Sequence, residues 1–202
     1  MRKLIIISLV LFTFISCSSK GELKFLNRTE HNLYFSFKGN DYILAGDKTR
    51  EFEFDTGNKF PFFASGEDKK ISLYLEGETF MMQTSDQFGN PTGNFFTETE
   101  VYVKPEKTTK IYANPTHASI KIINNSSSDV TNVAYDKIYA DSVTYSGNLV
   151  NLVPADSIWF EQMKAYTSDD SFSYVFTYEF VQQVYADTVL LGLDDQKLIE
   201  VE

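Results

Sequence analysis

The sequence predicts an all-β protein with two tandem β-sandwich domains, and three observations support this prediction. Apolar and polar residues alternate along most of the chain after residue 21, for example at residues 33–37 and 71–76. A period of two places every second side chain on one face of a sheet. Turn-forming segments interrupt the alternation every 8 to 12 residues or so, which is typical of a sandwich or barrel. The alternating segments also recur in the same order in both halves.

Strand segments and turns can be assigned in order along the chain. The alternation covers residues 33–37, 51–54, 71–76, 101–103 and 120–122, and the turn formers lie at 38–41, 56–58, 65–68 and 146–148. Only residues 156–166 have helical character, because Asp156 or Ser157 could cap a helix and Glu161 follows at capping distance. We nevertheless expect a strand there, because this segment takes part in the repeat described next.

The two halves of the chain contain three matching segments. Residues 23–29 match 120–126, apolar for apolar, with Lys, Asn and Thr or Ser in equivalent places. The second and third matches are 43–47 leading into 52–54 with 152–156 leading into 158–160, and 101–103 and 110–112 with 189–191 and 197–199. The alternative is that similar strand patterns arise by chance in any all-β protein.

The repeat predicts where the domains begin and end. Each half has about 90 residues, the size of a small immunoglobulin-like or transthyretin-like sandwich. Asn114-Pro115-Thr116 is a plausible junction, since proline discourages continuation of a sheet. We therefore expect a leader at 1–16, a tether at 17–21, and domains at 22–115 and 116–202.

The first 16 residues have the pattern of an export signal. A charged start, Met1-Arg2-Lys3, precedes an apolar run of about 12 residues. A transmembrane helix needs about 20 apolar residues, so a permanent span is the weaker interpretation. Ser16 then precedes Cys17, the single cysteine of the chain, and a short polar stretch follows. This junction resembles the lipobox of bacterial lipoproteins.

The resemblance implies a lipid anchor on Cys17. In that family the cysteine thiol receives a diacylglycerol, the leader is cut off before the cysteine, and the new amino group is acylated with a fatty acid such as palmitate. Ser18 stands where an aspartate would favour retention at the inner membrane, so the resemblance favours the outer membrane and leaves surface exposure open. The alternative is an ordinary signal peptide beside a buried cysteine.

Charge and composition argue against several functions. The net charge of −10 disfavours nucleic acid and broad contact with anionic lipid headgroups. His31 and His117 are the only histidines and lack metal-ligand spacing, so solvent-exposed turns are expected for both. The doublets Asp169-Asp170 and Asp194-Asp195 are interpreted as solvated turns. We therefore expect no catalytic residue, no metal and no cofactor.

Two aromatic features are candidate binding sites. Aromatic residues fill five alternate positions from Phe172 to Phe180. They predict a core strand, with an exposed binding face through Tyr174 and Tyr178 as the alternative. The second candidate is the loop 84–96, where Phe88 and Phe95 could recognise a ligand; a mobile hairpin tip is the alternative.

Together these patterns predict a lipid-anchored protein of the cell envelope. Its membrane contact would be the lipid on Cys17, and its expected role is a non-catalytic binding or assembly module for a protein or a glycan. Two alternatives remain open, a carboxylate-dependent hydrolase at the envelope and a structural subunit of an envelope complex.

Overall fold

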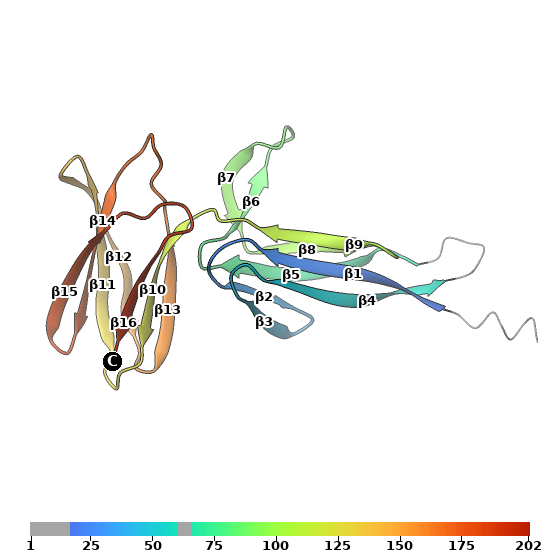
Figure 1. The fold of residues 1–202 in the computed structure, drawn as a ribbon, viewed down its shortest axis with the longest axis horizontal. Helices are drawn as coiled ribbons and strands as arrows, with labels where there is room; N and C mark the ends of the chain where they lie inside the picture. Colours follow the sequence, from blue (N-terminus) through green and yellow to red (C-terminus); the bar gives the residue numbers. More distant parts are fainter. Residues whose placement is uncertain (1–16, 60–65) are drawn as a thin grey trace, which may run out of the picture.

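The computed structural model describes residues 17–59 and 66–202, and every regular element within them is a β-strand (Figure 1). This confirms the predicted all-β fold of tandem β-sandwiches. The expected leader, residues 1–16, lies outside the described residues. No helix within the described parts of the chain is long and apolar enough to cross a membrane.

The first sandwich is formed by two sheets and one additional hairpin. The sheets have the strand orders β4-β1-β9 and β3-β2-β5-β8, and the hairpin β6-β7 is inserted between β5 and β8. The bounds are β1 Cys17–Asn27, β2 Leu33–Phe37, β3 Asn40–Leu44, β4 Thr49–Lys59, β5 Lys69–Gly77, β6 Met82–Ser85, β7 Pro91–Phe96, β8 Glu98–Val103 and β9 Thr108–Ala113.

The second sandwich repeats this arrangement without the hairpin. Its sheets have the orders β13-β10-β16 and β12-β11-β14-β15. The bounds are β10 Ala118–Asn124, β11 Val130–Tyr139, β12 Ser142–Val153, β13 Ser157–Met163, β14 Ser173–Phe180, β15 Gln183–Val189 and β16 Gln196–Val201. The segment with helical character, 156–166, therefore contains a strand, as expected.

The pairing registers correct two of the matches between the halves. β1 pairs antiparallel with β4 and parallel with β9, as β10 does with β13 and β16. Leu23 pairs with Phe52, whereas Ile120 pairs with Glu161, so residue 52 corresponds to 161 and not to 158. By the same reasoning, 110 corresponds to 198 and not to 197. Similar apolar patterns can be aligned at several shifts, and only strand pairing selects one of them.

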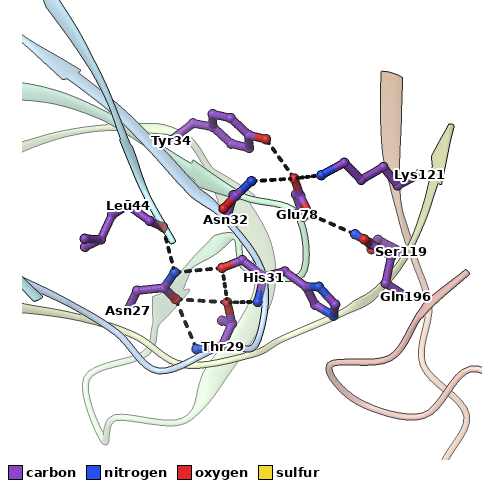
Figure 2. A network of polar contacts seen from close by, with 10 residues as sticks. All are labelled: Asn27, Thr29, His31, Asn32, Tyr34, Leu44, Glu78, Ser119, Lys121 and Gln196. Carbon is purple, nitrogen blue, oxygen red and sulfur yellow. Dashed lines mark hydrogen bonds and ion pairs between the residues drawn. The ribbon is translucent and has the colours of Figure 1, made fainter. Parts of the chain in front are cut away.

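A buried asparagine occupies the same place in both sandwiches. The Asn27 side chain accepts hydrogen bonds from Thr29 and donates to the carbonyls of His31 and Leu44 (Figure 2). It also donates to the carbonyl of Ala45. Asn124 makes the equivalent set of bonds with Ser126, Ser128, Val153 and Pro154. Each asparagine thus holds the loop after the first strand of its sandwich against the turn that precedes the fourth.

Each sandwich encloses its own apolar core. Aromatic rings dominate the first core, in which Phe25 and Phe35 stack with ring centroids 4.1 Å apart. The second core combines aliphatic residues with Phe172, Tyr174 and Phe176. Two separate cores are what tandem sandwiches require, because each sandwich must bury the inner faces of its own sheets.

Candidate functional site

Glu78 is a buried carboxylate at the joint between the sandwiches (Figure 2). It follows the end of β5, and its side chain is 1% exposed. Lys121 of β10 donates to Oε1 at 2.8 Å and Gln196 of β16 donates to Oε2 at 2.9 Å. From its own sandwich, the Tyr34 hydroxyl donates to Oε1 at 2.7 Å. A carboxylate of the first sandwich is therefore held by two residues of the second.

These partners keep Glu78 ionised. Burial by itself raises the pKa of this carboxyl, but hydrogen bonds from Lys121, Gln196 and Tyr34 bring the pKa below its usual value. Burial and the bond to Glu78 raise the pKa of Tyr34 to about 12. Glu78 is thus a negative charge in a structural ion pair, which disfavours a role as a general acid.

Several further contacts complete the joint. Tyr34 and Phe160 stack at 5.5 Å, and Gln162 donates to the carbonyls of Gly77 and Phe80 at 2.7 and 3.0 Å. The Asp194 carboxylate accepts from the hydroxyl of Thr79 and the backbone N–H of Glu30. The sandwiches therefore meet through direct side-chain contacts in addition to the covalent linker at residues 114–117, between β9 and β10.

The joint also corrects two expectations about turns. His31 and His117 were expected in exposed turns but are half-buried at the joint. A ring nitrogen of His31 lies 2.8 Å from the carbonyl oxygen of Asp194, and burial lowers the pKa of His117. Asp194 was expected in a solvated turn, yet its side chain takes part in the joint. Sequence reasoning missed this site because its residues come from five distant segments of the chain.

The loop 84–96 forms the β6-β7 hairpin, which carries an exposed aromatic tip. Phe88 is 79% exposed, and the Asp86 carboxylate accepts hydrogen bonds from the backbone N–H groups of Phe88 and Asn90, both at 2.8 Å. Phe95, 42% exposed, lies near the base, with its ring 4.8 Å from that of His117. The hairpin is thus tied at its turn and contacts the joint at its base.

The aromatic strand β14 is mainly a core strand. Tyr174 is 2% exposed, and its hydroxyl donates to the carbonyl of Lys164 at 3.0 Å, so it cannot present its ring on a binding surface. Burial raises its pKa to about 12. Tyr135 of β11 contacts the rings of both Tyr174 and Phe176, and so fills the space between large neighbours. Tyr178 is half-buried and stacks on Tyr185 of β15 at 5.2 Å.

The acidic residues that line two depressions of the described segments, Asp55, Glu67 and Asp68 in one and Glu98 and Glu100 in the other, are all exposed. Glu78 is the one carboxylate among the buried residues of these segments. A depression of about 450 Å³ beside Tyr74 is lined by Glu98 and Glu100, both of which are exposed. No group of three or more His, Cys, Asp or Glu side chains in the described parts could hold a metal ion.

The fold and these surfaces define the class as a tandem β-sandwich protein with a tightly bonded joint. Solved structures resemble it weakly. A Bacillus anthracis TIE protein is 10% identical over 90% of this chain and 33% of that chain, with a TM-score of 0.27. A DUF3823 family protein from Bacteroides uniformis is 9% identical over 87% of this chain and 100% of that chain, with a TM-score of 0.23. A third is the major pilin T-13 of Streptococcus pyogenes, which is 9% identical over 92% of this chain and 96% of that chain, with a TM-score of 0.24. The chain thus spans about a third of the length of the TIE protein chain. No protein-family model and no curated protein matches the sequence.

Proposed function

We propose that this protein is a lipid-anchored, non-catalytic binding or assembly module of the bacterial cell envelope. The observation that carries the proposal is the Phe88 hairpin. Phe88 adds nothing to either core, yet Asp86 holds its backbone in a defined turn. A large apolar side chain kept exposed on an ordered hairpin is suited to insertion into a partner's pocket.

The position of the hairpin suits a partner that lies away from the membrane. β1 begins at Cys17 and runs about 33 Å along the first sandwich to Asn27. The hairpin and the second sandwich lie near the other end of this strand (Figure 1). A lipid on Cys17, at the outer membrane, would therefore display Phe88 at a distance from the bilayer, where an envelope protein or glycan can reach it.

The anchor is tested by the mass of the mature N-terminal peptide from native membranes. We expect a diacylated or triacylated peptide that begins at Cys17, and membrane association that a Cys17→Ser variant loses. Protease treatment of intact cells then reports whether the protein is surface-exposed. An unmodified N-terminus in the soluble fraction would contradict the anchor.

The binding function is tested by a photo-reactive amino acid placed at position 88 in cells. A probe at Tyr102, which is 51% exposed on β8, is the matched control. We expect adducts with an envelope component from position 88 alone. A single partner recovered in a constant ratio to this protein would favour the alternative role of a structural subunit in an envelope complex. Equal labelling from positions 88 and 102, or no labelling from either, would contradict binding at the hairpin.

A further inference from the structure

The edges of the four larger sheets differ in how well they are protected. An edge strand presents unpaired N–H and C=O groups to any extended chain, and proteins block such edges with charged residues, bulges, short strands or covering segments. Seven of the eight edges in the described residues carry at least one of these features. With charges held in ion pairs set aside, these features are Arg50 on β4, Asp41 on the short β3, Glu98 on β8, Lys110 on β9, two register shifts in β12, the joint over β13, and Glu200 on β16.

The strand β15 lacks this protection. It has seven residues and pairs with β14 without a register shift. Its single charged residue, Asp187, forms an ion pair with Lys197 of β16, in the other sheet. The edge of β15 that faces away from β14 is therefore open to another strand. No charge outside an ion pair on β15 opposes the approach of such a strand.

Apolar side chains are exposed on both faces of this edge. Val184 is 70% exposed and Tyr185 is 40% exposed, and successive residues of a strand point to opposite faces. A strand added beside β15 would cover part of both. Backbone pairing and apolar burial would thus act together, as in other cases of strand addition.

The turn before β15 keeps an apolar residue at a conformational cost. Val181 and Gln182 have φ of +48° and +61°, the left-handed region in which Asn and Gly are favoured. A β-branched residue is strained there, and Val181 is 62% exposed, so its side chain gains little from packing. An exposed valine in a strained turn beside an open edge suggests that a partner contacts this hairpin.

The equivalent edge of the first sandwich shows that protection is available within this fold. β8 takes the place of β15 in the strand order, and it carries Glu98 on its exposed side, in addition to Glu100, which pairs with Lys70. β15 also lies at the end of the molecule opposite the start of β1 (Figure 1). The unprotected edge is thus the one placed farthest from Cys17.

We propose that β15 is a docking edge that accepts an extended segment of a partner protein by β-strand addition. The segment would have small or β-branched residues at alternate positions and few acidic residues, since this chain carries a net charge of −10. The docking edge is distinct from the Phe88 hairpin, so it goes beyond the proposed function and stands whether or not the hairpin binds.

The test uses the purified full-length protein and a fluorescent heptapeptide with the sequence of residues 183–189, whose pattern suits this edge. Two further peptides carry N-methyl groups on odd or on even amides, so that only one keeps the N–H groups that face β15. Fluorescence anisotropy should show binding of the unmodified peptide and of one methylated form, and a loss of about tenfold or more for the other. Equal affinity of the two methylated forms, or no binding, would overturn the proposal.

Variants then locate the bound peptide and identify competing occupants. Val184→Lys should weaken binding about tenfold, while Val143→Lys, at an exposed position of β12, and Phe88→Ala should leave it unchanged. Light scattering reports the mass of the free protein. A dimer that Val184→Lys converts to a monomer would assign the edge to a second copy of this chain and would overturn docking of a partner.

Discussion

The two sandwiches share a strand order but differ in what they expose. In both, a buried asparagine holds the first loop, and an aspartate with positive φ, Asp47 or Asp156, forms the turn before the fourth strand. The first sandwich adds the β6-β7 hairpin and has charges on β8, whereas the second has no inserted hairpin and leaves β15 open. The comparison teaches that residues which close the fold recur, while loops and edges are free to diverge for recognition.

The largest expected effect tests the equivalence of the two asparagines. Asn27→Ala and Asn124→Ala should each lower the free energy of unfolding by about 4 kcal/mol, because each leaves several buried donors and acceptors unpaired. Denaturant unfolding of the two variants checks this, with Asn148→Ala, at an exposed position of β12, as the surface control. A large loss of stability at only one of the two positions would contradict the equivalence of the two asparagines.

The next effect concerns the contact between the sandwiches. Lys121→Met should cost about 3 kcal/mol, because it leaves the Glu78 carboxylate buried without its cation. In the Lys121→Met variant we also expect the two sandwiches to unfold in separate steps, which calorimetry would resolve. Lys20→Met, at an exposed ion pair with Glu53, is the matched control and should have little effect.

The same carboxylate predicts a pH dependence of smaller size. Its pKa in the folded protein is lower than the ordinary 4.5, so its contribution to stability is present above about pH 4.5 and is lost as the pH falls through the folded pKa. Thermal unfolding from pH 7 to pH 3 should show this loss, and Glu78→Gln should reduce it. An identical pH profile for the variant would show that other carboxylates account for the acid sensitivity.

Relief of strain in the β14-β15 turn should give a small gain in stability. Val181→Asn places a residue that tolerates positive φ at this position, and the free energy of unfolding should rise by about 1 kcal/mol. Chemical denaturation measures the change. A less stable variant would show that Val181 stabilises the fold by packing. The strained turn would then no longer support a docking role for this hairpin.

The smallest effect is expected at the hairpin that the second sandwich lacks. Phe88→Ala should change the free energy of unfolding by less than about 0.5 kcal/mol, because the ring is exposed. The melting temperature should therefore stay constant while any binding through the hairpin is lost. A clear loss of stability would instead place Phe88 in the fold.

Local patterns allowed much of the fold to be anticipated. The alternation at residues 33–37 and 71–76 and the matching 23–29 and 120–126 depend on neighbours in sequence, and the structure shows strands at these places. The alternation could not establish the register between β1 and β4, because a similar apolar pattern is available at other shifts. The burial of Tyr174 likewise depended on Tyr135, a residue on another strand.

The sequence by itself determined the all-β class and predicted a repeat of strand segments and a lipobox-like junction at Cys17, because each depends on periodicity or on adjacent residues. Only the tertiary structure decided the joint and the exposed edge. Glu78, Lys121 and Gln196 meet although more than 40 residues separate each from the next along the chain, and β15 is an edge only because of the strand order. Long-range pairing places such residues together, and no local pattern records it.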